Sequence, residues 1–135
     1  MPYLQLDLPA HYPADVKRRL ARALGDLYCA HMQARPGIVT VGFRELGPDN
    51  LWKSGNIEPR PGALIQCDIR RGRPSAQREA LAREIVALCV RELRLAEADI
   101  ALEFTQHAGD EMFRDGKLGP EWQPDEAERA RQQAV

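Results

Sequence analysis

The second residue of the chain is a candidate for chemistry. The sequence begins MPYLQLDLP, so Pro2 directly follows the initiator methionine. A small second residue normally allows Met1 to be removed, which would leave a secondary amine as the first group of the mature chain. An α-amino group titrates at about pH 7.7–8, and burial or neighbouring cations disfavour its protonated form. Pro2 is therefore a candidate general base or acid, provided that Met1 is removed, although residues near a terminus more often have no function.

A cluster of arginines is the second candidate. Arg70, Arg71 and Arg73 surround Gly72 in the segment DIRRGRPSAQRE, directly after a strand-like run. Planar guanidinium groups match the geometry of carboxylates, so this cluster can hold a small carboxylic acid at the end of a strand. A short basic turn that contacts only solvent has the same composition. The arginines alone leave both interpretations open.

The elements that must position these residues occur twice in the same order. Residues 3–8 alternate between apolar and polar side chains, which predicts a strand, and the apolar spacing then changes to that of a helix over 12–32. A second strand is predicted over 38–46. The order is repeated by a strand, a helix that begins with Ser75 as its N-cap, and a strand, over residues 63–70, 75–93 and 98–105.

Together these elements predict an α+β fold. It consists of two tandem βαβ units, at about residues 2–46 and 63–105. Strands joined through a helix pair in parallel with right-handed crossovers. The two units therefore predict a four-stranded sheet with two helices on one face. The other face needs a cover, and self-association is the usual one.

Two segments lie outside these units. The linker at 47–62 is rich in proline, glycine and asparagine, which is consistent with a turn or a short hairpin. The tail at 109–135 is irregular and then charged, and its end resembles a short solvated helix or a frayed terminus. Trp122 is expected to dock this tail onto a neighbouring surface. We expect one domain over residues 1–135.

Composition limits the class of protein. Of the 135 residues, 44% are hydrophobic and 29% are charged, with a net charge of −1, which is typical of a globular protein and gives no reason to expect nucleic-acid or membrane partners. The N-terminus lacks the basic and apolar regions of a signal peptide. Cys29, Cys67 and Cys89 have no metal-site spacing and are expected to be reduced residues in or near the core. These features predict a cytoplasmic protein without a metal site.

Pro2, the βαβ pattern and the Gly-Arg turn before a helix resemble the tautomerase superfamily. Its single-unit members, such as 4-oxalocrotonate tautomerase, place an arginine in a Gly-Arg turn similar to RRGRPSAQRE. The two-unit length and the segments ALGDLY, VGFRELGPDN, IRRGRPS and MFRDGKLGPEW resemble the cis-3-chloroacrylic acid dehalogenase group over nearly the whole chain. Each half has kept one role, because the first has Pro2 without a matching arginine and the second has the arginines without a free amine.

The resemblance implies a tautomerase that moves a proton within small enol or 2-oxo carboxylic acids. In this interpretation the Pro2 amine is the general base or acid, and Arg70 and Arg73 hold the carboxylate of the substrate. A general base of matched pKa typically contributes about 10²–10⁴-fold to the rate. The resemblance also implies a homotrimer and a reaction that needs neither a metal nor an organic cofactor.

Three positions differ from the dehalogenase group, whose members use a histidine, a tyrosine and a glutamate to activate water. The matching residues here are Tyr28, Glu103 and Arg114. Arg114 places a cation where that group has a carboxylate, which disfavours water activation. For this reason a hydratase, dehalogenase or decarboxylase of short unsaturated or 3-oxo acids is only the second functional hypothesis, after the tautomerase. The third, from a different class, is a non-catalytic protein that binds small acids or serves as a scaffold.

Four other side chains have weaker signals. His107, expected just after the last strand, is a possible pocket residue and the first alternative base. His11 and His31 are expected to be surface groups. Trp52 is expected either at the mouth of the pocket or in a subunit contact.

Overall fold

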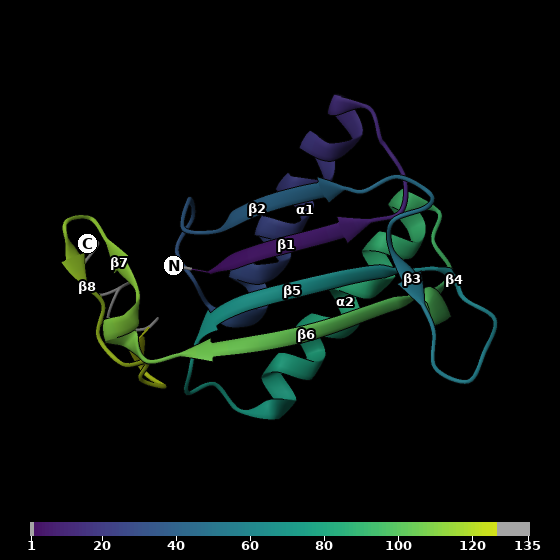
Figure 1. The fold of residues 1–135 in the computed structure, drawn as a ribbon. Helices are drawn as coiled ribbons and strands as arrows, with labels where there is room; N and C mark the ends of the chain where they lie inside the picture. The colour runs from purple at the N-terminus through teal and green to yellow at the C-terminus, as the bar shows by residue number, and fades with distance from the viewer. Residues whose placement is uncertain (1, 127–135) are drawn as a thin grey trace.

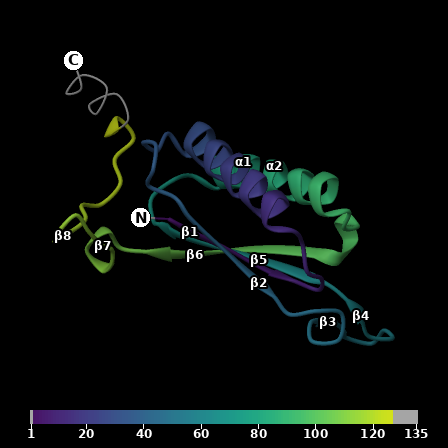
Figure 2. The ribbon, with the colours of Figure 1, turned by 90° about the horizontal axis from the view of Figure 1, so that it is seen from above.

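Two long helices lie side by side on one face of a four-stranded sheet (Figures 1 and 2). A computed structural model describes residues 2–126 of the chain. The helices are α1 (Ala14–Met32) and α2 (Ser75–Leu93), and the strands of the sheet are β1 (Tyr3–Leu8), β2 (Thr40–Glu45), β5 (Ala63–Arg70) and β6 (Ile100–His107). The described part of the chain thus has the predicted α+β fold of two βαβ units.

The sheet has the strand order β2-β1-β5-β6. Within each unit the strands pair in parallel, β1 with β2 and β5 with β6, as the helical crossovers predict. The two units join through β1 and β5, which pair antiparallel with Tyr3 opposite Asp68. This junction brings the first residues of the chain beside the end of β5.

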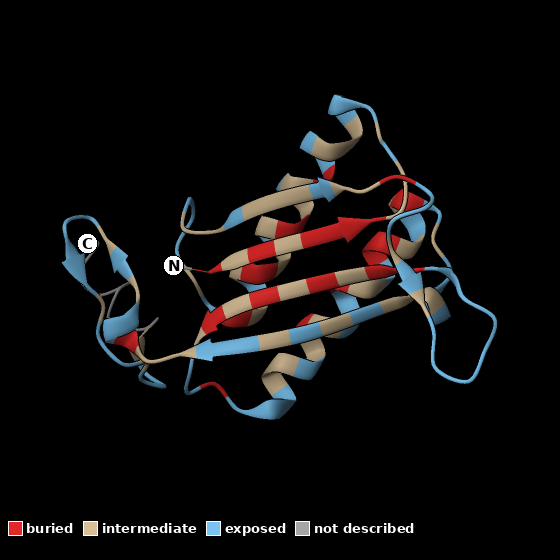
Figure 3. Ribbon diagram, in the orientation of Figure 1, coloured by how far each residue is buried: buried red, intermediate tan, exposed pale blue. Residues whose placement is uncertain are grey.

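The core lies between the sheet and the helices (Figure 3). Leu4, Leu6 and Leu8 of β1 are fully buried, because the alternation of the strand turns all three toward the helices. Burying a leucine side chain contributes about 1.5–3 kcal/mol. Cys67 and Cys89 belong to this core as free thiols, and burial raises the pKa of each to about 12.

The opposite face of the sheet is polar. The side-chain amide of Gln5 donates to Gln66 at 2.9 Å, and the amide of Gln66 donates to Glu103 at 2.9 Å, so one row of hydrogen bonds crosses three strands. No helix of the described residues covers this face (Figure 2). The face therefore suits water or another polar surface rather than an apolar partner.

The boundaries of two elements differ from the prediction. Ser75 is the first residue of α2 rather than its N-cap, because the extended Pro74 (φ −61°, ψ 154°) occupies the cap position. The strand predicted at 98–105 begins two residues later, since residues Glu97–Asp99 form a short 3-10 helix, η1. His107 therefore ends β6 instead of following it.

The linker and the tail each contain a short hairpin. In the linker, β3 (Trp52–Lys53) pairs with β4 (Arg60–Pro61), as the turn-rich composition allows. In the tail, a 3-10 helix, η2 (Gly109–Glu111), precedes an unpredicted hairpin of β7 (Phe113–Arg114) and β8 (Lys117–Leu118). The helix or frayed end expected near the C-terminus falls mainly at 127–135, outside the described residues. Among the residues described, no helix is long and apolar enough to cross a membrane.

Candidate active site

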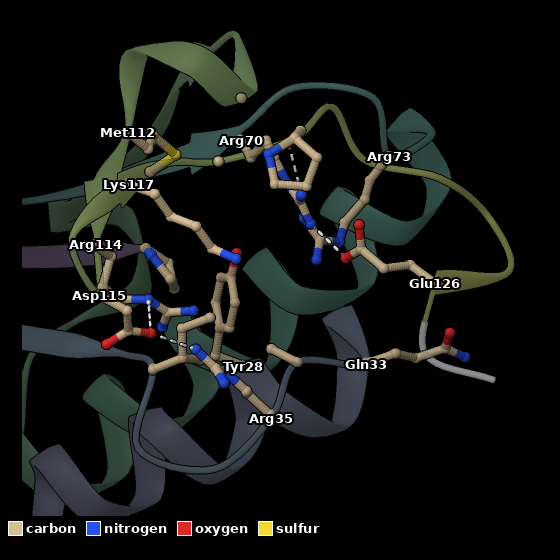
Figure 4. Close-up of a pocket in the computed structure, with 16 residues that line it drawn as sticks. Tyr28, Gln33, Arg35, Arg70, Arg73, Met112, Arg114, Asp115, Lys117 and Glu126 are labelled. Atoms are coloured by element: carbon tan, nitrogen blue, oxygen red, sulfur yellow. Dashed lines mark hydrogen bonds and ion pairs between the residues drawn. The ribbon is translucent and has the colours of Figure 1, made fainter. Parts of the chain in front are cut away.

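A cavity of about 340 Å³ opens where β1 begins and β5 ends (Figure 4). The antiparallel register of these strands carries Pro2, at the start of β1, toward Arg70, the last residue of β5. Both residues line the cavity. Pro2 is buried, and its carbonyl accepts a hydrogen bond from the backbone N–H of Thr40 at 3.0 Å. The amine candidate from one half of the chain and an arginine from the other therefore share one cavity.

Arg73 forms the wall of the cavity next to the end of α1. Its side chain is buried, and its Nε and Nη2 atoms donate to the carbonyl of Met32 at 3.2 and 3.1 Å. Met32 is the last residue of α1, where carbonyl groups lack a partner within the helix. Burial lowers the pKa of the Arg73 guanidinium. Arg73 thus caps a helix, and among the described residues its Nη1 has no hydrogen-bond partner.

Tyr28 places a buried hydroxyl at the cavity. It lies one turn before the end of α1 and is only 2% exposed, yet it lines the cavity. Burial raises the pKa of its hydroxyl to about 12, although nearby Arg73 acts in the opposite direction. The phenol therefore stays protonated at neutral pH and can donate a hydrogen bond to a ligand.

The β7–β8 hairpin contributes charged side chains from the opposite side. Its turn is Asp115-Gly116, both at positive φ (53° and 78°), as a tight hairpin requires. Arg114 and Lys117 flank this turn, and both line the cavity (Figure 4). The Asp115 carboxylate lies 2.9 Å from Arg35 and 3.6 Å from Arg114. One carboxylate is thus shared by two guanidinium groups.

Cations outnumber anions in the cavity. Two carboxylates, those of Asp115 and Glu126, lie among the lining residues, against five cationic side chains: Arg35, Arg70, Arg73, Arg114 and Lys117. Glu126 pairs with Arg70, whose side chain is 17% exposed. An excess of positive charge in a partly enclosed space favours an anionic ligand, and guanidinium groups suit a carboxylate.

Comparison with known proteins agrees with this arrangement at the level of fold. No family model matches the sequence, and no curated protein matches it. Among solved structures, N1, a member of the cis-3-chloroacrylic acid dehalogenase (cis-CaaD) family, has a TM-score of 0.80 and 25% identity, over 94% of this chain and 89% of N1. The chain belongs to the tautomerase superfamily. Within the superfamily it is similar to the cis-CaaD group.

Two further tautomerase-superfamily folds are similar to this one. A fused 4-OT described as a symmetric trimer has a TM-score of 0.77 and 18% identity, over 87% of this chain and 94% of the other. Pt0534, crystallised after inactivation by 2-oxo-3-pentynoate, has a TM-score of 0.76 and 20% identity, with the same coverage of 87% and 94%. Both are matched over nearly their full length, so the two-unit architecture is shared.

Three residues that the sequence suggested for the pocket of this tautomerase-superfamily chain do not line the cavity. Glu103 lies on the polar face of the sheet, where it accepts a hydrogen bond from Gln66. His107 lies at the end of β6, where its carbonyl accepts a hydrogen bond from the backbone N–H of Arg71 at 2.7 Å, and it is not among the lining residues. Trp52 belongs to the β3–β4 hairpin at the opposite end of the sheet, so it is not at the mouth of this cavity (Figure 1).

Several residues that line the cavity were not identified as candidates from the sequence. Arg35 follows α1 in the segment ARPG, which indicates only the end of a helix. Lys117 and Asp115 belong to RDGK, and its Asp-Gly pair is a hairpin signal that would have predicted the β7–β8 turn. Glu126 lies in a charged segment without a local signal. Its place depends on how the tail crosses the arginines.

Proposed function

We propose that this chain is a cofactor-independent tautomerase of small enol or 2-oxo carboxylic acids. The observation that supports this most is that Pro2, Arg70 and Arg73 line one cavity although they come from different halves of the chain. After removal of Met1, the Pro2 amine is the general base and acid. Arg70 and the remaining donor of Arg73 bind the carboxylate of the substrate.

The reaction requires only a proton that leaves one atom and returns to another. The neutral amine takes the proton from the enol hydroxyl, which leaves an enolate, and the resulting ammonium delivers that proton to the substrate carbon. Negative charge develops on the oxygen next to the carboxylate, and the guanidinium groups of Arg70 and Arg73 stabilise it. The Tyr28 hydroxyl, which stays protonated, adds a neutral donor. The reverse sequence converts the ketone into the enol.

A second function has one observation in its favour. Asp115 lines the cavity next to Arg114, so a carboxylate is present near the position where the cis-CaaD group activates water. Its two guanidinium partners, Arg35 and Arg114, engage that carboxylate as an ion pair. Proton transfer through Pro2 therefore remains the favoured function. Hydration or dehalogenation would appear as halide release from 3-haloacrylates that Asp115→Asn abolishes.

Covalent labelling tests the proposed site directly. Because the similar protein Pt0534 is inactivated by 2-oxo-3-pentynoate, we expect the processed form of this chain to gain the mass of one such molecule on Pro2, with loss of activity. A nucleophilic amine adds to the alkyne, and the arginines bind the 2-oxo acid. Peptide mass spectrometry locates the label. Labelling of a cysteine instead of Pro2, with activity retained, would contradict the proposal.

We further propose that the chain forms a homotrimer in which the polar sheet faces surround a central axis. The fused 4-OT with a similar fold is described as a symmetric trimer. The row formed by Gln5, Gln66 and Glu103 also suits a polar, water-filled interior. Sedimentation at micromolar concentration should give three times the mass of the chain. A stable monomer under these conditions would exclude this assembly.

A further inference from the structure

All three side chains of the arginine cluster, Arg70, Arg71 and Arg73, hold the tail of the chain. Arg70 donates from Nη1 to the carbonyl of Pro120 at 2.8 Å and pairs with the carboxylate of Glu126. Arg71 pairs with Glu121 at 3.1 Å. The guanidinium of Arg73 lies 5.6 Å from the centre of the Trp122 ring, within the range of a cation–π contact. Residues 120–126, called the tail latch below, thus lie across the cluster that is proposed to bind substrate.

Two glycines make room for the tail latch. A Cβ atom added to Gly109 would lie 2.0 Å from the carbonyl oxygen of Pro120, which no real contact allows. A Cβ added to Gly72, which has a φ of 124°, would lie 3.0 Å from the Trp122 ring. The backbone N–H of Gly109 also donates to Glu121 at 2.8 Å. The docked position of the tail therefore depends on glycine at two separate points.

The last residue of the tail latch presents a carboxylate to the cavity. Glu126 lines the cavity, and its carboxylate contacts the terminal nitrogen Nη2 of Arg70 (Figure 4). Its side chain is 38% exposed, so water can reach it and the contact can open. A carboxylate on a guanidinium is also the contact proposed for the substrate. The chain thus carries its own occupant for that position.

We propose that the tail latch is autoinhibitory: Glu126 occupies the carboxylate position on Arg70, and a substrate must displace it to bind. The inference rests on the proposed function, because it takes Arg70 as the carboxylate-binding residue. A ligand that binds only the open form has its apparent affinity reduced by the fraction of molecules that are open. Removing the charge of Glu126 should therefore raise the affinity for small 2-oxo acids without changing the donors that bind them.

The test uses the full chain and Trp122 as a reporter. Trp122 and Trp52 are the two tryptophans of the sequence, so Trp52→Phe leaves a single fluorophore on the tail latch. In this background we expect Glu126→Gln to shift the ligand-free emission of Trp122 to longer wavelength and to tighten pyruvate binding about fivefold, as expected for one partly exposed ion pair. The matched control is Glu79→Gln, which removes a carboxylate from an exposed ion pair on α2 and should change neither quantity.

A second variant opens the tail latch without touching Glu126. Gly109→Ala displaces Pro120 from Arg70, and it should shift the Trp122 emission and tighten pyruvate binding in the same direction. Unchanged emission and affinity in Glu126→Gln would overturn the latch. Arg70→Ala separates this failure from that of the proposed function. Loss of pyruvate binding in Arg70→Ala supports Arg70 as the carboxylate site, so that a failure of Glu126→Gln concerns the tail latch alone. Full pyruvate binding in Arg70→Ala rejects Arg70 as that site and, with it, the autoinhibitory role of Glu126.

Discussion

Blocking the amine of Pro2 should abolish activity on phenylenolpyruvate and 2-hydroxymuconate. An N-terminal tag, or retention of Met1, converts the proline nitrogen into an amide, whose lone pair is delocalised and cannot accept a proton. The cavity and its arginines would be unchanged, so the loss would appear in kcat rather than in the fold. Ultraviolet absorbance of the enol gives the rate, and the mass of the N-terminal peptide shows which form is present.

The matched control carries the same tag after Val135 and should keep full activity. Pro2→Ala should keep the fold and a primary amine, and should lose only part of the activity. A tagged, Met1-retaining protein that ketonises these enols as fast as the processed one would rule out the proline mechanism. Lys117, the other amine-bearing side chain of the cavity, would then be the first alternative base, ahead of His107, which lies outside it.

The pH profile gives an independent check on the same amine. Only the neutral amine accepts a proton, so kcat/KM should fall as the pH drops through its apparent pKa. Burial of Pro2 and the positive charges of Arg70 and Arg73 disfavour the ammonium form. We therefore expect this acidic limb of the profile to lie at a pH below the ordinary pKa range of an α-amine. Arg70→Ala should move it upward, because one of the repelling charges is removed.

Much of the fold was predictable because local patterns dictate it. The alternation of Leu4, Leu6 and Leu8 specified β1 and its buried face, and the helical crossovers specified parallel pairing within each unit. The antiparallel pairing of β1 with β5 was not predicted, because no local pattern encodes how two units join. That junction is what brings Pro2 to Arg70. The resemblance to a known superfamily pointed to Pro2, Arg70 and Arg73 as candidate site residues, and the topology accounts for how they come to line one cavity.

The rest of the cavity could not be predicted, for two reasons. Arg35, Lys117 and Asp115 reach the cavity through loops whose direction depends on tertiary packing rather than on periodicity. The strand register, in turn, keeps Glu103 on the opposite face of the sheet, away from the cavity. Of the three residues that match the water-activating positions of the dehalogenase group, the topology thus brings Tyr28 and Arg114 to the cavity and keeps Glu103 away from it.

Arg70→Ala should lower kcat/KM for a 2-oxo or enol acid by about 30- to 1000-fold, or roughly 2–4 kcal/mol, because a charge-paired contact made in the transition state is lost. The side chain is 17% exposed and its partners lie in the tail. Its removal should therefore leave the free energy of unfolding nearly unchanged. Steady-state kinetics and urea unfolding of the same preparation measure the two effects separately.

Arg73→Ala should lower kcat/KM by a similar amount and should also destabilise the fold. Its guanidinium is buried against the carbonyl of Met32, and an unpartnered buried acceptor costs about 1–3 kcal/mol. Arg71→Ala is the matched control, since that side chain is largely exposed and lies outside the cavity, so it should not lower kcat/KM. Loss of its pair with Glu121 in the tail latch would act in the opposite direction, toward tighter substrate binding. Equal kinetic losses in all three variants would indicate a general basic patch, because a specific carboxylate site requires Arg70 and Arg73 to differ from their neighbour.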